Sequence, residues 1–435
     1  MLPPRTHALG FLWLARRGCD KHSGSGLGDM ATDFVGWRRE GQLPYLSGGF
    51  SVGCIELEFP APTAVGACSA ICFYPSTDDA SCGERPPWLS DEQLEEMGRA
   101  ELSPFFGEAA SVFFMRSLGG VATGLLRLPA TRGLSPAALP ESFRLEGWPV
   151  AVLSHGLSGW ATESAGLAAS LCSHGCVVLL LDHCDSACHC DDYEEWRQAM
   201  LAHGIGESAL AADGEVWRRS QNEQRIAEVH AALDHLNAQI KRADERRFAL
   251  FRARTGRGVA LVGHSFGGAT AAACVLRDGE SKAPRFSHCF VSDPWIGGVA
   301  SPLSEAELAG RPLAAGLKTM RVWLNEGSPN VMKSYLAAAE TLVHSSKLAG
   351  AKSAELIRVP AEPDAQIDTP TVLSSGPFAC LWAVARGAAD RADGIAGMRP
   401  DAVPARAALR SCIVETLEPL LEQGWLAVGL APLGP

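Results

Sequence analysis

From about residue 148 onward, short apolar runs rich in β-forming residues alternate with helical stretches, and this alternation constrains the fold more than any other feature of the sequence. Such a pattern predicts a mostly parallel sheet with helices on both faces, and in sheets of this kind the chemistry lies at the carboxyl ends of the strands. The predicted strands are residues 148–156, 176–183, 258–265, 288–294, 319–327 and 354–361, and the predicted helices are residues 160–175, 221–240, 331–347 and a helix that begins at Gly267.

The stretch VALVGHSFGGATAAA, residues 259–273, predicts a buried strand, a tight turn that holds Ser265, and the start of a helix. It contains the pattern G-x-S-x-G, in which small residues flank a serine on a strained strand-to-helix turn. The same pattern occurs at residues 49–53, but there the serine precedes a strand and the required context is absent. We therefore interpret Ser265 as a nucleophile.

A serine nucleophile needs an oxyanion hole and an acid. The backbone N–H of Phe266, directly after the nucleophile, is the expected first donor, and the N–H of Leu157 in the turn SHGLSG is the expected second. Asp293 ends the next predicted strand, so the order serine, then acid, fits a catalytic triad.

The rest of the chain suggests one large domain with an added N-terminal segment. Residues 1–45 are interpreted as a disordered extension, with a targeting peptide as the alternative, and residues 46–435 as a single domain. Within it, residues 50–76 predict an antiparallel hairpin that enters the sheet, residues 77–147 an irregular insertion, and residues 404–424 a closing helix.

The composition excludes several classes of protein. A net charge of −11 with interspersed signs argues against a nucleic-acid partner, and no apolar run approaches the ~18 residues that span a bilayer. The fourteen cysteines have no regular spacing in a long chain, which favours reduced thiols in a cytosol-like compartment over a secreted or organellar location. The segment DHCDSACHCDD crowds its ligand types too closely for a usual zinc site, so we expect no metal and no other cofactor. Its possible ligands are His183, Cys184, Cys188, His189 and Cys190.

Eight ordered segments together make the chain resemble the platelet-activating factor acetylhydrolase family in its α/β-hydrolase form (the plasma and intracellular type II enzymes). These segments are SVGC at 51–54, FYPS at 73–76, LSHGLSG at 153–159, SLCSHGCVV at 170–178, DHCD at 182–185, NEQR at 222–225, VGHSFGGAT at 262–270 and SDPW at 292–295. The resemblance implies the α/β-hydrolase fold and metal-free hydrolysis of the short sn-2 acyl ester of phospholipids. It also implies Ser265 as nucleophile, Asp293 as acid, and Leu157 and Phe266 as oxyanion donors.

The triad base departs from the family pattern. The family places its histidine after the last strand in a G-x-x-H-x-x-F-x-D type segment, whereas residues 361–378 read AEPDAQIDTPTVLSSGPF and no histidine follows His344. His344 lies late in a predicted helix, at the amino ends of the strands. His155 and His183 follow strands at the correct pole, and are weak candidates for a replacement base because relatives keep both beside their own catalytic histidine. A carboxylate such as Glu362 or Asp364 would not reproduce the acid–base range of imidazole.

Three alternatives for function therefore stay open at the level of sequence. The first is a serine hydrolase of short-chain or phospholipid esters that makes transient contact with a membrane surface. The second is a catalytically impaired relative that binds lipid or a protein partner, since loss of a triad base costs on the order of 10⁶ in rate. The third is an incorrect coding sequence around residues 355–380 that conceals the histidine. Oligomeric state is not indicated by any feature of the sequence.

Overall fold

The computed structural model divides the chain into two units, Met1–Leu43 and Pro44–Pro435. All of the residues described below lie in the second unit. They are residues 48–62, 67–97, 108–114, 116, 127–143, 146–157, 159–184, 207–241, 252–297, 301–304, 308, 316–325, 333–359 and 416–426.

The described strands form one mixed sheet in the order β3-β1-β2-β5-β4-β6-β7-β8-β9. All neighbouring strands from β5 to β9 are parallel, as are β1 and β3, while β2 is antiparallel to both β1 and β5. The strands are β1 (Ser51–Pro60), β2 (Ala67–Ser76), β3 (Thr131–Arg132), β4 (Val150–Ser154), β5 (Val177–Asp182), β6 (Val259–His264), β7 (Phe286–Ser292), β8 (Thr319–Asn325) and β9 (Ser353–Val359). This order, with one antiparallel strand beside a parallel run, is that of the α/β-hydrolase fold and confirms the expected fold class.

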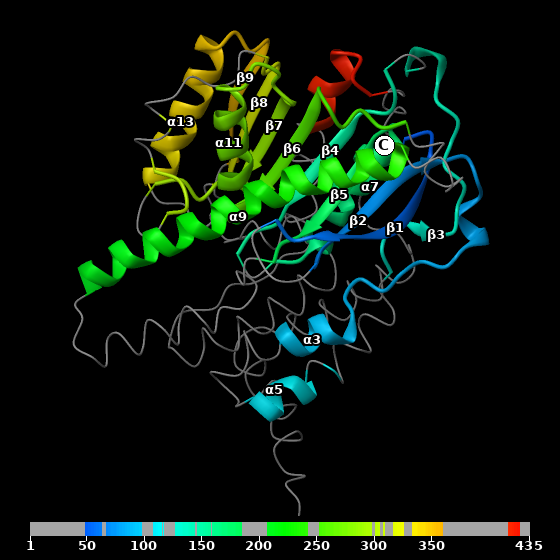
Figure 1. Cartoon of the computed structure of the whole chain (residues 1–435), viewed down its shortest axis with the longest axis horizontal. Helices are drawn as coiled ribbons and strands as arrows, with labels where there is room; N and C mark the ends of the chain where they lie inside the picture. Colours follow the sequence, from blue (N-terminus) through cyan, green and yellow to red (C-terminus); the bar gives the residue numbers. More distant parts are fainter. Residues whose placement is uncertain are drawn as a thin grey trace, which may run out of the picture. The chain divides into compact units, whose positions relative to one another are not determined.

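Helices cover both faces of the sheet (Figure 1). On one face, α9 (Glu207–Lys241), α11 (Phe266–Asp278) and α13 (Lys333–Leu348) enclose a large hydrophobic core with the strands. On the other face lie α7 (Ala165–Ser173) and the short helix at residues 416–422. Strands buried on both sides should be apolar without alternation, and β4 and β6 are buried at every position.

The chain reverses its direction of winding at β4. Strand β5 pairs with one edge of β4 and β6 with the other. The loop after β4 then leads to α7 on one face, whereas the turn after β6 leads to α11 on the opposite face. The carboxyl ends of β4 and β6 therefore border the crevice in which α/β sheets bind their ligands.

Several elements differ in extent from the sequence prediction. The helix predicted at residues 221–240 begins earlier, at Glu207, and the helix predicted at residues 160–175 is a 3-10 turn, η5 (Ala161–Ser164), followed by α7. The hairpin is confirmed, because β1 and β2 pair antiparallel from Ser51↔Ser76 to Pro60↔Ala67. The described parts of the expected irregular insertion contain η1 (Ala80–Cys82), α3 (Asp91–Met97), α5 (Glu108–Phe114), β3 and η4 (Glu141–Phe143).

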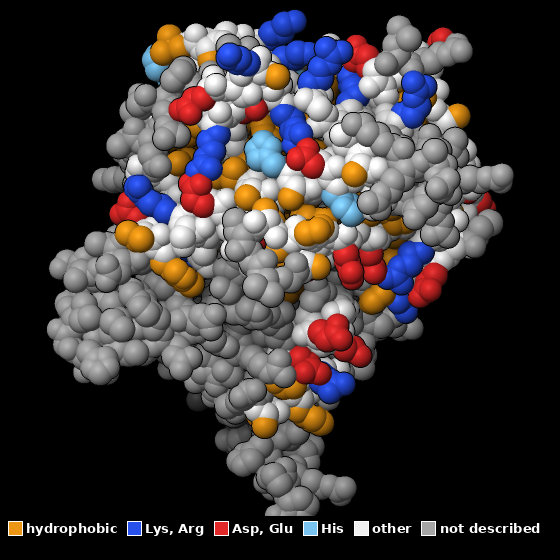
Figure 2. Space-filling model, viewed as in Figure 1, with side chains coloured by type: hydrophobic (Ala, Val, Ile, Leu, Met, Phe, Trp, Pro, Cys, Tyr) orange, Lys and Arg blue, Asp and Glu red, His pale blue; other side chains and the backbone are white. Residues whose placement is uncertain are grey.

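Acidic and basic side chains are interspersed on the face that includes α9 (Figure 2). Arg219 bonds Glu215 at 2.6 Å, Arg285 bonds Asp234 at 2.6 Å, and Arg277 pairs with Glu223. Because these pairs are exposed, each contributes only ~0–1 kcal/mol to stability. No helix among the described residues is both long and apolar enough to cross a membrane.

Replacing glycine by alanine should change the free energy of unfolding in opposite directions at two positions. A Cβ at Gly267 would lie 2.0 Å from the carbonyl oxygen of Ser154, so Gly267→Ala should lower the free energy of unfolding by ~1–3 kcal/mol. A Cβ at Gly166 in α7 meets nothing within 4 Å, so Gly166→Ala should raise it by ~0.5–1 kcal/mol. Chemical denaturation of both variants measures the two effects, and an unchanged midpoint for Gly267→Ala would contradict the close backbone approach.

Candidate active site

Ser265 occupies a strained turn between β6 and α11. Its φ of 50° and ψ of −114° lie in a region that side chains other than glycine rarely adopt. Backbone strain of this kind costs ~1–3 kcal/mol and persists only where the surroundings hold it. The turn presents the serine at the carboxyl end of the sheet, as a nucleophile requires.

The loop after β7 is bound to this turn by backbone hydrogen bonds. The Ser265 N–H donates to the carbonyl of Ser292 at 3.0 Å, and the N–H of Trp295 donates to the carbonyl of Ser265 at 2.9 Å. The residue between these contacts, Asp293, has a φ of 39° and donates its own N–H to the carbonyl of Trp323 at 2.9 Å. Asp293 is therefore held in a fixed backbone conformation beside the nucleophile turn.

The side chain of Asp293 is buried. Tyr335 in α13 is also buried. Its own burial raises its pKa to about 12, and the negative charge of the nearby Asp293 adds to this shift. The loop after β7 thus brings a carboxylate to the same end of the sheet as Ser265.

The loop after β4 lies against the nucleophile turn. A Cβ at Gly156 would stand 3.4 Å from the Cβ of Ser265 and 3.0 Å from Nδ1 of His264. At Gly267 the start of α11 approaches the backbone of Ser154 and His155 so closely that only glycine fits. Leu157, the next residue along this loop, and Phe266, the first residue of α11, are thus held on the two sides of this contact.

The N–H groups of both residues are available to a ligand. Phe266 lies in the first turn of α11, where a backbone N–H has no helical partner. In the part of the chain that the structure describes, neither the Leu157 N–H nor the Ser265 hydroxyl makes a hydrogen bond. These groups could therefore act on a bound carbonyl group.

A buried carboxylate braces the loop after β4 against β6. Glu163 in η5 accepts from Nδ1 of His264 at 2.9 Å and from the N–H of Gly156 at 3.3 Å. Burial by itself would raise the pKa of Glu163, but the hydrogen bond and charge of His264, with smaller contributions from His155 and the Gly156 N–H, hold it below its usual value. Glu163 is therefore ionised at neutral pH, and it links the residue before the nucleophile to the candidate oxyanion loop.

The two histidines that were weak candidates for the base have partners at both ring nitrogens. His183 Nδ1 donates to Glu228 Oε2 at 2.6 Å, and its Nε2 bonds the Ser154 hydroxyl at 2.8 Å. His155 Nδ1 donates to the carbonyl of Gly156 at 2.8 Å, and its Nε2 accepts from the His183 N–H at 3.3 Å. Burial, with the charges of Arg225 and His183, lowers the pKa of His155 to about 3. Each ring therefore holds the loop after β4 in place.

Helix α9 supplies two further supports that sequence reasoning missed. Arg225 is fully buried, donates to the carbonyl of His155 at 2.8 Å and stacks 4.2 Å from the Phe266 ring centre. Glu228, one turn later, holds His183. The NEQR segment marked this part of α9, but nothing in the sequence indicated which loop its side chains would reach.

The remaining candidates for the base fall elsewhere. His344 is exposed in the last turns of α13, shortly before β9 begins, so it lies toward the amino ends of the strands as the sequence indicated. Glu362, Asp364 and the segment expected to carry the family's histidine lie outside the described residues, as do Cys188, His189 and Cys190.

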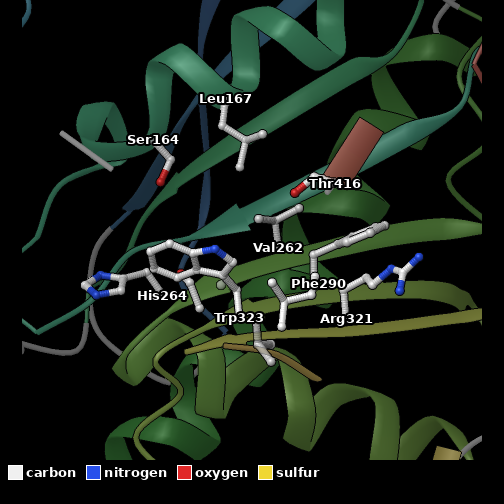
Figure 3. A pocket seen from close by; sticks show the side chains of 12 residues that line it. Ser164, Leu167, Val262, His264, Phe290, Arg321, Trp323 and Thr416 are labelled. Carbon is white, nitrogen blue, oxygen red and sulfur yellow. The ribbon is translucent and has the colours of Figure 1, made fainter. Parts of the chain in front are cut away.

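A hollow lies on the α7 face of the sheet, where side chains of α7, β6, β7 and β8 converge (Figure 3). It is lined by Leu167, Val262, His264, Phe290 and Trp323, among others, and extends to Thr416. Gly263 and His264 at the end of β6 both border this hollow, and a Cβ at Gly263 would lie 2.1 Å from the carbonyl oxygen of Gly267 in α11. Because Ser265 does not line it, we do not place an ester substrate there.

The sheet order and the strained serine turn define a protein of the α/β-hydrolase class. A family model described as platelet-activating factor acetylhydrolase, isoform II, matches residues 35–309, and the chain belongs to this family. It is 27% identical over 274 residues to the platelet-activating factor acetylhydrolase of Canis lupus familiaris, a match that covers 59% of this chain and 56% of the relative. The chain thus spans about half the length of that relative. The Gallus gallus protein of the same name is 25% identical over 312 residues, covering 66% of this chain and 68% of the relative.

A comparison of structures finds the ferulic acid esterase from Streptomyces cinnamoneus. Its TM-score is 0.48 and its sequence identity 16%, with 85% of this chain and 91% of the esterase covered.

The buried histidines predict how stability depends on pH. Burial is the main cause that lowers the pKa of both His155 and His288 to about 3. As pH falls below about 6.5, the unfolded chain binds protons that the folded chain does not, so each group removes ~1.4 kcal/mol of stability per pH unit until the pH approaches 3. The pKa of Glu163, held below its usual value, adds a further loss as pH falls through its own range.

Urea unfolding between pH 7 and pH 4 measures this slope. His288→Asn, in β7 away from the Ser265 turn, should reduce the slope by about one proton. An unaltered slope in His288→Asn would show that this ring does not contribute.

Proposed function

We propose that this chain is a serine hydrolase of carboxylic esters that cleaves the short sn-2 acyl ester of phospholipids, as a 1-alkyl-2-acetylglycerophosphocholine esterase does. One observation carries the proposal. The strained Ser265 turn is held between the loop after β7, which carries Asp293, and the loop after β4, which carries Leu157. Family membership supports the choice of a phospholipid ester as substrate.

Each residue of the proposed site has a separate role. The Ser265 hydroxyl attacks the ester carbonyl, and the N–H groups of Phe266 and Leu157 stabilise the oxyanion that forms. Asp293 orients the base that takes the proton of Ser265 and returns it to the leaving alcohol. Water then releases the acyl group from Ser265 by the reverse sequence.

The setting of the reaction also belongs to the proposal. The substrate class implies transient contact with a membrane surface, and no cofactor is needed for acyl transfer of this kind. A net negative chain with interspersed charges supports the absence of a nucleic-acid partner. A cytosol-like compartment stays a prediction from cysteine usage.

A second candidate function is a catalytically impaired protein that binds lipid or a protein partner. It is favoured by the absence of any histidine after His344 and by the engagement of His155 and His183 in structural hydrogen bonds. Without a base, such a protein would retain only the ~10³–10⁴-fold acceleration that binding and the oxyanion hole provide.

The two serines in G-x-S-x-G patterns supply a matched test. Ser265 lies in the strained turn, whereas Ser51 begins β1. A fluorophosphonate probe should label the wild-type chain and the Ser51→Ala variant but not Ser265→Ala, and hydrolysis of a 2-acetyl phospholipid or p-nitrophenyl ester should show the same pattern. Failure to label a folded wild-type chain would favour the binding protein.

The identity of the base needs its own measurement. Asp293→Asn should lower kcat by about 10⁴ if Asp293 orients an imidazole. A loss on the order of 10⁶ in His155→Gln or His183→Gln, with an unchanged melting temperature, would assign the base to that ring. If neither loss occurs in an active enzyme, resequencing the transcript over residues 355–380 tests whether a histidine is present there.

A further inference from the structure

Three possible metal ligands from distant parts of the sequence meet beside the candidate active site. They are Cys68 at the start of β2, Cys184 just after β5, and Glu228 in α9. The two sulfur atoms and a carboxylate oxygen all lie within 4.8 Å of one another. A tetrahedral zinc ion needs thiolate sulfurs about 3.8 Å apart at Zn–S bonds of about 2.3 Å, so these atoms can close on one ion with small side-chain rotations.

The pairing of two strands fixes the positions of the thiols. Strands β2 and β5 are antiparallel with Ser69 opposite Asp182, which brings Cys68 next to the chain that leaves β5. The Cys184 thiol reaches back to the carbonyl of Ala67 at 3.5 Å. Strand pairing and this thiol contact therefore fix the two cysteines close to each other in the fold.

We propose that Cys68, Cys184 and Glu228 form a binding site for a thiophilic divalent cation of the zinc class, separate from the residues proposed to act on the ester. Two sulfurs with one carboxylate oxygen favour zinc, whereas calcium and magnesium prefer ligands that are all oxygen. Three protein ligands leave a fourth tetrahedral position for water or another donor.

Charge and protonation are consistent with this site. Burial raises the pKa of the Cys68 thiol, and the adjacent Cys184 and Glu228 raise it further. Thiol ligands must lose their protons to bind a cation, so affinity should rise with pH. Burial raises the pKa of Glu228, and the hydrogen bond from Gln224 and the positive charge of Arg225 offset part of that rise.

One of the three ligands lies at the surface. Cys184 is only partly buried, and it lines a hollow together with Trp217, Gln221 and Gln224 of α9. Gln224, which also lines this hollow, donates to Glu228 Oε1 at 2.9 Å.

The site shares its carboxylate with the candidate active site. Glu228 Oε2 holds His183, which bonds the Ser154 hydroxyl at the end of β4. A bound cation would draw electron density from this carboxylate and weaken its hold on His183. Occupancy is therefore expected to alter the loop that carries Leu157, which couples the cation site to the ester site.

Cadmium titration of the reduced full chain tests the proposal, because cadmium–thiolate bonds absorb in the ultraviolet. One cadmium ion per chain should produce the band, and Cys68→Ser and Cys184→Ser should each weaken binding on the order of 100-fold or more. Cys176→Ser is the matched control, because Cys176 is a buried thiol before the amino end of β5 and should leave binding unchanged.

Zinc titration followed by thermal melting gives a second measurement. Zinc should raise the melting temperature of the wild type and of Cys176→Ser, but not of the half-exposed Cys184→Ser. Two results would overturn the proposal: no cadmium–thiolate band in the wild type, or equal affinity in the wild type, Cys68→Ser and Cys184→Ser. Binding that is lost in a Cys188→Ser and Cys190→Ser double variant but kept in Cys68→Ser would also overturn it, because the ligands would then be other cysteines.

Discussion

The positive φ of Ser265 is the constraint on which the rest of the site depends. A serine left to itself would relax from this conformation, at a gain of ~1–3 kcal/mol. Two backbone hydrogen bonds to the loop after β7 prevent this, and the same bonds place Asp293 beside the turn. The glycine at 267 lets the loop after β4 press against the other side. Strain at one residue thus determines where both neighbouring loops lie.

Two buried carboxylates stabilise the loop after β4 from opposite directions. Glu163 reaches it from the α7 face through Gly156 and also holds His264, while Glu228 reaches it from the α9 face through His183. Buried ionised groups are costly unless they are paired, and both carboxylates have several donors. The candidate oxyanion loop is therefore held by polar contacts whose loss would leave a charge buried without compensation.

The sequence predicted the parts of this arrangement that depend on local pattern. Strand–turn–helix context predicted the turn at Ser265 and excluded residues 49–53, and the order of the strands predicted that Leu157 and Asp293 follow strands at the same edge of the sheet. The sequence did not predict Glu163 bonded to His264, or Cys68 beside Cys184 and Glu228, because these contacts join residues that only the three-dimensional fold brings together. The sequence analysis of residues 183–190 considered only neighbours along the chain, so it could not bring Cys68 and Glu228 next to Cys184. The early start of α9 at Glu207 was missed because its first turns lack the apolar period of the rest.

Arg225 and Glu228 are three residues apart on α9, so they share one face of a single helical turn. One binds the carbonyl of His155 and the other binds the ring of His183. A rotation of α9 about its axis could not adjust one contact without disturbing the other. A substitution at either position alone would therefore break one of the two contacts. Among relatives, changes at these two positions should occur together with changes at the histidines that they contact.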